Sequence, residues 1–379
     1  MTTIVPPSTI GMLGGGQLGR YALIAARQMG FATVVLDPDP LAPAGAVADR
    51  HLVANFDDAD ALENLCNECS VITTEFENPP RESLDVIALR LPVRPSPSAI
   101  AVAQDRQHEK QFLTAHGFEV GPYVNLDGGV MSDVEPLLPG IVKTARLGYD
   151  GRGQTRVSSV DEVSGAVARL GDARCVLERR LNLVVEISVI VARSVGGETV
   201  TWPASENHHV DGVLDFTVVP ARVPDGLLSE ADQLARQIAM ALDYVGVLAV
   251  EMFVIDSDGG HRLLVNELAP RPHNSGHWTL DASFTDQFTQ QIRSITGSAL
   301  ASTAMTVPAV AMVNLLGDLW ESGEPDWSAA QAESRARVHL YGKATARPGR
   351  KMGHLTVVGE EVDQVADQAR ALRAVISRS

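Results

Sequence analysis

Cysteine is scarce in this chain of 379 residues, which has only 3. So few cysteines argue against a disulfide framework. Cys66 and Cys69 do form a C-x-x-C pair, a spacing found in redox and metal sites. No second such pair and no pair of histidines accompanies them at the spacing of a zinc finger. The pair falls in a polar stretch with a helical pattern, and we interpret it as two thiols without a function.

Positive charge and long apolar runs are scarce as well. Lys and Arg number 31 against 47 Asp and Glu, which gives a formal net charge of −16. This balance argues against a nucleic-acid partner bound through a general basic surface. No apolar run approaches the roughly 20 residues of a membrane span, and the N-terminal residues show no secretory signal. We therefore expect a cytoplasmic protein with no nucleic-acid and no membrane partner, in which anionic ligands would need local clusters of Arg and Lys.

The composition and length predict a globular protein with more than one core. Hydrophobic residues make up 45% of the chain, and 379 residues exceed one ordinary core. Strand-like and helical segments alternate over the first hundred residues, which predicts an α/β unit with a parallel sheet. Farther along, strand-like segments follow in quick succession, which is typical of an α+β domain. We predict a Rossmann-like domain over 1–105, a second domain over 106–305 and a small β-rich domain over 306–379.

The segment IGMLGGGQLGR, residues 10–20, contains the G-x-G-x-x-G pattern at Gly14, Gly16 and Gly19. The next apolar run ends in Asp37, close to where a dinucleotide-binding fold places an acid on a ribose hydroxyl. Taken alone, this segment predicts a nicotinamide cofactor and an oxidoreductase. That interpretation gives no role to the polar clusters farther along the chain.

Two carboxylates occupy matched positions in a predicted hairpin, GVLAVEMFVIDSDGGHRLLVNELAPR. Its turn is centred on Gly259, and Glu251 and Glu267 each lie 8 residues from that centre. Regular pairing would set them opposite each other with Cβ atoms roughly 5 Å apart, where like charges repel unless they share a cation or a proton. Asn266 adds an oxygen, and such hard ligands suit Mg²⁺. We predict a Mg²⁺ site at Glu251 and Glu267. The alternative is a pair of solvated carboxylates in an exposed hairpin. It fits less well, because both strands are otherwise apolar.

Two loops combine glycine or basic residues in a way that suits phosphate. The loop GYDGRGQ, residues 148–154, has 3 glycines that permit close backbone approach, with Lys143 and Arg152 to supply charge. It is not a Walker A loop, because Gly-Lys-Ser/Thr is absent, and alone it indicates only a flexible hairpin tip. Arg350 and Lys351 in ARPGRKMGH suit a substrate phosphate, and a solvated surface turn is an equal alternative.

The segment NELAPRPHNSGHWT gathers polar side chains directly after an apolar strand. Its histidines lack the H-E-x-x-H spacing of a zinc site, so a loop that binds an anion fits better than a metal cage. Arg271 offers a planar fork that matches a carboxylate-like anion, and His273 and Asn274 add donors in the same loop. We predict that these three residues are catalytic.

Several segments together resemble one family. In chain order they are GGGQLGR, DRQHEK, KTARLGYDGRGQ, NHHVDGVL, NELAPRPHNSGHWT and RPGRKMGHL. They are similar to those of the N5-carboxyaminoimidazole ribonucleotide synthetases, which belong to the ATP-grasp superfamily. The resemblance covers nearly the whole chain, and GYDGRGQ and NELAPRPHNSGHWT are specific to the family whereas GGGQLG is not.

The resemblance implies an ATP-grasp fold and a ligase of purine biosynthesis. ATP, Mg²⁺, bicarbonate and 5-aminoimidazole ribonucleotide would be its reactants and cofactors. Carboxyphosphate would form first and then carboxylate the amine of the ribonucleotide. A homodimer is implied as well. Arg271, His273 and Asn274 would hold the bicarbonate.

The resemblance also implies the residues of both binding sites. The implied ATP-binding residues are Arg106, Lys143, Gly148, Tyr149, Asp150, Gly151, Arg152, Gly153, Gln154, Glu178, Arg179, Arg180, Leu181, Glu186, His209, Asn266 and Glu267. The implied residues for the ribonucleotide are Gln17, Leu18, Glu75, Asp150, Arg152, Arg350 and Lys351.

With this resemblance the glycine-rich turn no longer implies NAD. Gln17, Leu18 and Glu75 would face the ribonucleotide, Gly16 would let the backbone approach it, and Asp37 would be an ordinary acid at a strand end. The alternatives are another ATP-grasp ligase that activates a different acid, an NAD-dependent oxidoreductase, and a non-catalytic nucleotide-binding module. The last has no use for the polar loop after Glu267.

Overall fold

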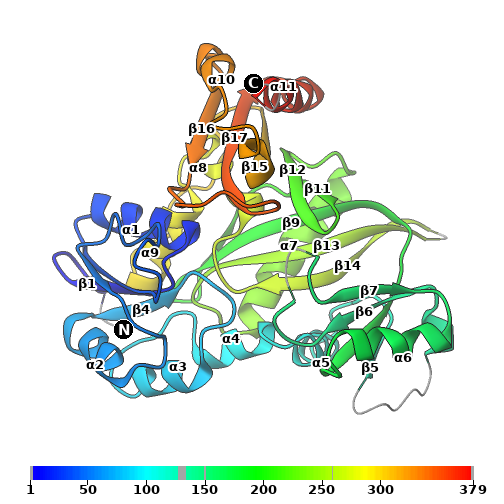
Figure 1. The fold of residues 1–379 in the computed structure, drawn as a ribbon, viewed down its shortest axis with the longest axis horizontal. Helices are drawn as coiled ribbons and strands as arrows, with labels where there is room; N and C mark the ends of the chain where they lie inside the picture. The colour runs from blue at the N-terminus through cyan, green and yellow to red at the C-terminus, as the bar shows by residue number, and fades with distance from the viewer. Residues whose placement is uncertain (1–2, 127–133, 149–150, 258, 377–379) are drawn as a thin grey trace.

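The computed structural model describes residues 3–126, 134–148, 151–257 and 259–376. Within them, the N-terminal part forms a parallel sheet of the order β3-β2-β1-β4, flanked by helices (Figure 1). Strands β1, β2 and β4 are buried almost throughout, as a sheet covered on both faces requires, whereas the edge strand β3 is partly exposed. The strands are β1 (Thr9–Leu13), β2 (Ala32–Leu36), β3 (Arg50–Leu52) and β4 (Val71–Thr74). The helices are α1 (Gln17–Gln28), α2 (Ala59–Glu68), α3 (Arg81–Ala88) and α4 (Pro97–Ala103).

Helix α9 (Gln287–Thr296) completes the N-terminal core although it lies far along the chain. Phe288, Ile292 and Ile295 of this helix are fully buried in one apolar cluster with residues of β1 and α1. The helix ends at Gly297, whose φ of 75° is the left-handed conformation that favours glycine. The N-terminal unit therefore depends on a helix from the segment 106–305, and this packing is what the sequence pattern did not predict.

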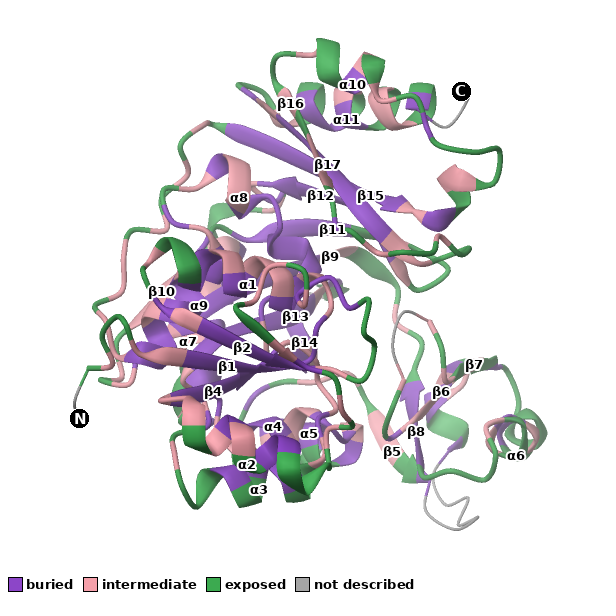
Figure 2. Cartoon of the chain, turned by 60° about the vertical axis from the view of Figure 1, so that its left-hand side comes forward, coloured by how far each residue is buried: buried purple, intermediate pink, exposed green. Residues whose placement is uncertain are grey.

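A small antiparallel sheet has the order β5-β8-β6-β7 and stands apart from the body of the molecule, covered by α6 (Figure 2). Helix α5 precedes it, and β6 and β7 form the hairpin that carries the glycine loop 148–154. The elements are α5 (Arg106–Ala115), β5 (Tyr123–Leu126), η1 (Glu135–Leu137), β6 (Gly140–Thr144), β7 (Gln154–Val157), α6 (Val160–Arg169) and β8 (Cys175–Arg179).

The central sheet has the order β14-β13-β9-β11-β12-β15-β17-β16, with β10 paired to β9. Strand β12 pairs with β15, so the C-terminal strands extend this sheet across the boundary that we predicted at residue 305. Its strands are β9 (Leu183–Arg193), β10 (Thr199–Thr201), β11 (Ser205–Val210), β12 (Val213–Val219), β13 (Gly246–Ser257), β14 (Gly260–Ala269), β15 (Ala309–Leu316), β16 (Ala336–Leu340) and β17 (Lys351–Gly359).

Helices bury the faces of the central sheet. Alanines and Ile238 of α7 pack on β9 and β13, and α11 covers the strands near the C-terminus. The remaining elements are α7 (Asp225–Ala241), η2 (Asn274–Gly276), α8 (Thr279–Ala282), η3 (Gly317–Trp320), α10 (Ser328–Ala332) and α11 (Val362–Ile376). Among the described helices, none combines the length and the apolar character that a membrane crossing requires.

The C-x-x-C pair lines neither of the two cavities described below. Cys66 lies in α2 and Cys69 follows its end, and both are free thiols. Burial raises the pKa of Cys69 to about 12, and the pKa of Cys66 is raised as well. Neither side chain is therefore a thiolate at neutral pH.

An ion-pair network ties the central sheet to α11. The backbone N–H and Nε of Arg222 each donate to Glu206 Oε2 at 3.0 Å, and Arg222 Nη1 donates to Asp363 at 2.7 Å. Burial alone would raise the pKa of Glu206, but the hydrogen bonds from Arg222 and His208 and the charge of Arg222 lower it to about 2. Glu206 is therefore an ionised, buried partner of Arg222.

We expect Glu206→Gln to lower the free energy of unfolding at pH 7 by about 2–3 kcal/mol, since each pKa unit corresponds to about 1.36 kcal/mol. Because the folded pKa of Glu206 is depressed, its contribution is present above the unfolded value of 4.5 and is lost as the pH falls toward 2. Urea denaturation at pH 7 and pH 3.5 measures this, with the exposed Asp367→Asn as the control. An equal loss at both pH values would contradict the prediction.

Candidate active site

Two cavities meet beside the hairpin of β13 and β14. The larger, of about 950 Å³, is lined by the start of α1, the segment after β4, the loop after β14 and the segment before β17. The smaller, of about 570 Å³, is lined by the small antiparallel sheet and the central sheet. Both cavities share the residues Arg106, Arg152, His209, Gly212, Glu251 and Glu267, which we call the shared wall. Ligands in the two cavities would approach each other at this wall.

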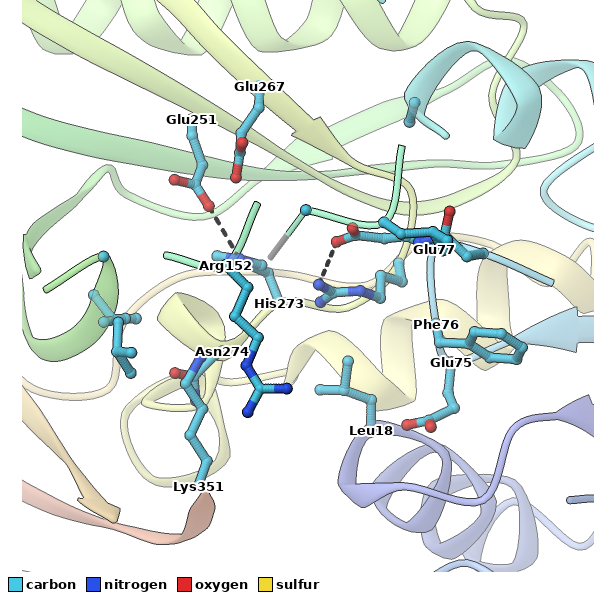
Figure 3. Close-up of a pocket in the computed structure, with 18 of the residues that line it drawn as sticks. Leu18, Glu75, Phe76, Glu77, Arg152, Glu251, Glu267, His273, Asn274 and Lys351 are labelled. Carbon is cyan, nitrogen blue, oxygen red and sulfur yellow. Dashed lines mark hydrogen bonds and ion pairs between the residues drawn. The ribbon is translucent and has the colours of Figure 1, made fainter. Parts of the chain in front are cut away.

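Glu251 and Glu267 lie opposite each other on β13 and β14 and extend side by side into the larger cavity (Figure 3). The pairing is not regular. Next to the turn, Ser257 pairs with Gly260, a register that would set Glu251 against Asn266. A register shift directly after Glu251 moves its partner by one residue. The irregularity, and not the regular hairpin that we predicted, therefore creates the carboxylate pair.

The two carboxylates have different partners. Arg106 Nη1 donates to Glu267 Oε2 at 2.8 Å, and His273 Nε2 lies 3.1 Å from Glu251 Oε1. Burial alone would raise the pKa of Glu251, but the hydrogen bond from His273 and the charges of His209 and Arg271 lower it to about 2. Glu251 is therefore a carboxylate at neutral pH.

The oxygen atoms at the shared wall suit a hard divalent cation. Asn266, next to Glu267, lines the smaller cavity, and its buried Oδ1 has no hydrogen-bond partner among the described residues. Two facing carboxylates and a neutral oxygen are the ligand types that Mg²⁺ takes, and a cation would remove the repulsion between the carboxylates. These residues therefore fit the Mg²⁺ that we predicted.

Lys143 and two carboxylates, Glu178 and Glu186, line the smaller cavity. Glu178 contacts Lys143 Nζ at 2.8 Å and Lys110 Nζ at 3.2 Å. Burial alone would raise the pKa of Glu178, but the two lysines hold it well below the usual range. On the opposite side, Glu186 lies 2.8 Å from His209 Nδ1. Burial alone would lower the pKa of His209, and Glu186 raises it above the usual value. Cations for phosphates and a carboxylate for ribose hydroxyls make this cavity suitable for a nucleotide.

Most residues expected for ATP line the smaller cavity. They are Arg106, Lys143, Gly151, Arg152, Gln154, Glu178, Arg179, Arg180, Leu181, Glu186, His209, Asn266 and Glu267. Gly148 lines the larger cavity instead, and Gly153 lines neither. Tyr149 and Asp150 lie outside the described residues.

The glycine loop has a geometric reason for its glycines that the sequence did not show. Gly151 and Gly153 have φ angles of 77° and 71°, in the left-handed region. A Cβ on Gly151 would lie 2.4 Å from the carbonyl oxygen of Asp211, and one on Gly153 would lie 2.5 Å from Thr144 Oγ1. Gly151 therefore packs on the turn between β11 and β12. Both Gly151 and Gly153 are required by their positive φ angles and by the lack of space for a Cβ atom.

The larger cavity carries a concentration of positive charge at the segment that leads into β17 and at the first residue of that strand. Lys343, Arg347, Arg350 and Lys351 line it there. We predicted Arg350 and Lys351 and missed the other two, although they stand in the same stretch GKATARPGRK. Gln17, Leu18 and Glu75, which we expected to contact the ribonucleotide, also line the larger cavity. Arg152 lines it as well. Asp150, expected here too, is not among the described residues.

The glycine-rich turn cannot hold a dinucleotide pyrophosphate, because carboxylates of the chain already occupy its donors. Asp37 accepts the N–H of Gly15 at 2.6 Å, and Glu75 accepts those of Gly16 at 2.8 Å and Gly19 at 3.1 Å. In dinucleotide-binding folds such N–H groups face the pyrophosphate. A Cβ on Gly16 would lie 2.5 Å from Glu75 Oε1. Gly16 therefore makes room for the side chain of Glu75, and not for the approach of the backbone to the ribonucleotide that we predicted. Asp37 stabilises the turn by its hydrogen bond from Gly15.

Comparison with known proteins identifies the family. An N5-carboxyaminoimidazole ribonucleotide synthase of Bacillus subtilis is 41% identical over 364 residues, which cover 95% of this chain and 94% of that protein. The enzyme of the same name from Brucella melitensis is 43% identical over 94% of this chain and 97% of its own. The chain belongs to the N5-carboxyaminoimidazole ribonucleotide synthase family.

Domain and structure comparisons agree with this family. Family models match a ribonucleotide synthetase preATP-grasp domain over residues 8–104, an ATP-grasp domain over 111–288 and a phosphoribosylaminoimidazole carboxylase C-terminal domain over 310–368. The ADP complex of an N5-carboxyaminoimidazole ribonucleotide synthetase superposes with a TM-score of 0.92 at 38% identity over 98% of both chains. The synthase of Aspergillus clavatus in complex with ADP and 5-aminoimidazole ribonucleotide has a TM-score of 0.86 at 28% identity, over 98% of this chain and 99% of its own. The ATP-grasp fold that the resemblance implied is confirmed.

In this synthase-family chain, the three residues that we predicted to be catalytic all line the larger cavity, each with a protein partner. Arg271 forms an ion pair with Glu77. His273 contacts Glu251. Asn274 Nδ2 donates to Asn314 Oδ1 at 3.1 Å, and Asn314 Nδ2 donates back to Asn274 Oδ1 at 2.6 Å. The three side chains are therefore held in fixed orientations.

Sequence reasoning missed several residues at the site of this synthase-family chain. Glu77 stands in the stretch TTEFENPP, from which we took only Glu75, and it reaches Arg271 from another domain. Asn314 is a lone polar residue in the apolar stretch AVAMVNLL, and that contrast is a signal that could have identified it. Glu109 is buried, lines the larger cavity and accepts the N–H of Leu268 at 2.7 Å. Its position opposite β14 depends on tertiary packing that no local pattern reveals.

Proposed function

We propose that this chain carboxylates 5-aminoimidazole ribonucleotide with bicarbonate, at the expense of ATP, as a step of purine biosynthesis. The observation that carries the proposal is the shared wall, where a nucleotide cavity and a second cavity with a basic segment meet at Glu251 and Glu267. A reaction that passes a phosphoryl group from ATP to a small acid, and then the acid to an amine, needs such a meeting point.

On the ATP side, Lys143 and Arg106 would face the phosphates and Glu186 the ribose hydroxyls. Glu251, Glu267 and Asn266 would hold Mg²⁺. When bound, the ion offsets the negative charge of the phosphates and so favours attack on phosphorus. The ion pairs that Lys143 and Arg106 make with Glu178 and Glu267 keep both cations in the cavity before ATP arrives.

Arg271 would orient bicarbonate for attack on the γ-phosphorus of ATP. A new P–O bond forms to a bicarbonate oxygen, the bond to ADP breaks, and carboxyphosphate results. The charge that develops on this intermediate faces the guanidinium of Arg271. The substrate amine then forms a C–N bond to the carboxyl carbon, directly or through released CO₂. Phosphate leaves and one proton of the amine is released.

The ribonucleotide would lie in the larger cavity. Its phosphate suits the basic segment of Lys343, Arg347, Arg350 and Lys351. Its imidazole would then reach toward Leu18, and Gln17 and Glu75 would complete the opposite wall. Its amine would have to face the shared wall to receive the carboxyl group.

Ligand-induced stabilisation tests the cofactor. MgATP at a hundredfold excess over its Kd should add about 2.7 kcal/mol to the stability of the folded state and raise its melting temperature, whereas NAD should have no effect. Stabilisation by NAD but not by MgATP would contradict the proposal.

Release of ADP tests the substrates. It should require both 5-aminoimidazole ribonucleotide and bicarbonate, with each omitted in turn. If ADP is released at the full rate when another acid replaces bicarbonate, the protein is a different ATP-grasp ligase.

The resemblance further supports a homodimer in the cytoplasm as the working form of the enzyme. Light scattering coupled to size-exclusion chromatography measures this: a mass of twice the 40.4 kDa chain is expected, and a monomer mass at working concentration would contradict it.

A further inference from the structure

A row of buried polar side chains crosses the central sheet and ends at Glu251. Strands β12, β11, β9 and β13 are neighbours in the sheet. Thr217 lies opposite Asn207, and Ser188 lies opposite Glu251. Thr217 and Ser188 are fully buried and Asn207 nearly so. Ser275, fully buried in η2, covers the row.

Hydrogen bonds link the row without a gap. Thr217 Oγ1 lies 3.0 Å from Asn207 Oδ1, and Asn207 Nδ2 lies 2.9 Å from Ser188 Oγ. Ser188 Oγ lies 2.8 Å from Ser275 Oγ, which lies 2.8 Å from His273 Nδ1. His273 Nε2 then reaches Glu251 Oε1 at 3.1 Å.

One backbone N–H group determines which atom is the donor in every hydrogen bond of the row. The N–H of Ser275 points at His273 Nδ1 at 3.4 Å, and an amide N–H can only donate. Nδ1 therefore carries a lone pair, the hydroxyl of Ser275 donates to it, and the neutral ring carries its proton on Nε2. Each hydroxyl has one hydrogen, so Ser275 must in turn accept from Ser188.

The same logic continues to the far end of the row. Because Ser188 donates to Ser275, its oxygen accepts from Asn207, whose amide must turn Nδ2 toward Ser188 and Oδ1 toward Thr217. All the hydrogens then point from Thr217 to Glu251. Bonds aligned in this way polarise one another.

We propose that Ser275, Ser188, Asn207 and Thr217 are positioning residues that hold His273 in its Nε2–H form, so that it donates to Glu251 and orients this carboxylate for the divalent cation. The proposal rests on the metal site of the proposed function. Residues that orient a metal ligand in this way commonly change metal affinity 10–100-fold when removed. None of these four residues needs to touch a substrate.

The tautomer of His273 can be measured without metal, nucleotide or activity. In the full chain labelled with ¹⁵N-histidine, long-range ¹H–¹⁵N correlation at alkaline pH should show His273 with Nε2 protonated and Nδ1 bare, assigned by the loss of its signals in His273→Gln. Ser275→Ala and Ser188→Ala should both move the two nitrogen shifts toward a tautomer mixture. A wild-type ring with Nδ1 protonated, or unchanged shifts in either variant, would overturn the proposal.

Mn²⁺ binding, followed by electron paramagnetic resonance without nucleotide, tests the consequence for the metal. Ser275→Ala and Ser188→Ala should weaken it at least about tenfold. Ser205→Ala is the matched control, since this buried serine donates to the carbonyl of Ser275 and accepts from Trp278 but lies outside the row. An equal loss in the control would overturn the proposal in favour of general packing.

The two measurements separate this proposal from the proposed function. If the wild-type protein fails to bind Mn²⁺, the metal site at Glu251 is wrong and the orienting role proposed here fails with it. If Mn²⁺ binds normally and only the tautomer is insensitive to the serine variants, the positioning role is wrong and the metal site stands.

Discussion

Glu267→Gln is expected to lower kcat by roughly 100- to 1,000-fold while the protein stays folded. The substitution keeps the shape and leaves an oxygen that can still accept from Arg106, but it removes a charge that a dication needs. A metal ion supplies several kcal/mol of charge stabilisation in phosphoryl transfer, and each 1.36 kcal/mol is a factor of ten in rate. Steady-state ADP release against Mg²⁺ concentration measures both the loss of kcat and the rise in the Mg²⁺ requirement.

Asp256→Asn is the matched control for this variant. Asp256 is an exposed acid on the same hairpin, outside both cavities, and makes an ion pair with His261. The control should turn over normally. Near-normal turnover of Glu267→Gln at ordinary Mg²⁺ would remove the carboxylate pair from the mechanism.

Arg271→Lys is expected to raise the KM for bicarbonate roughly 10- to 100-fold and to leave the KM for ATP nearly unchanged. Lysine keeps the positive charge beside Glu77 but loses the planar fork that matches a carboxylate-like anion. A hydrogen bond to a charged group contributes about 1.5–3 kcal/mol, which corresponds to this range. The measurement is ADP formation in CO₂-free, bicarbonate-depleted buffer with 5-aminoimidazole ribonucleotide present, followed by adding bicarbonate back.

Arg262→Lys controls for the general effect of the exchange. Arg262 is a half-exposed arginine of β14 near Glu119, outside both cavities. It should behave like the wild type. The role of Arg271 is refuted if wild-type ADP release ignores the depletion, or if Arg271→Lys keeps the wild-type dependence on bicarbonate.

The carboxylate pair shows how far a local pattern can be trusted. The spacing around the turn predicted that Glu251 and Glu267 would face each other, and they do. The prediction assumed a regular ladder centred on Gly259, whereas the register beside the turn is offset by one residue and a bulge corrects it. No spacing rule reveals a bulge, because it depends on how β13 also pairs with β9 on its other side.

The glycine-rich turn shows the opposite case. Its sequence pattern is that of a dinucleotide site, and its local structure, a turn between β1 and α1, is what that pattern predicts. The ligand is excluded by Glu75, which lies about 60 positions away and reaches the turn because β4 is the neighbour of β1. The family resemblance, and not the pattern, led to the right interpretation.

The sequence by itself determined the alternation of strands and helices, the positions of the glycine loop and the basic segment, and the family. These are properties of residues near one another in the chain, where periodicity and spacing act directly. Only the tertiary structure decided that α9 completes the N-terminal core and that Glu77 forms an ion pair with Arg271. It also decided that a row of hydrogen-bonded side chains runs from Thr217 to Glu251. Each of these depends on which strands are neighbours and which faces meet, and that order follows from the packing of the whole chain.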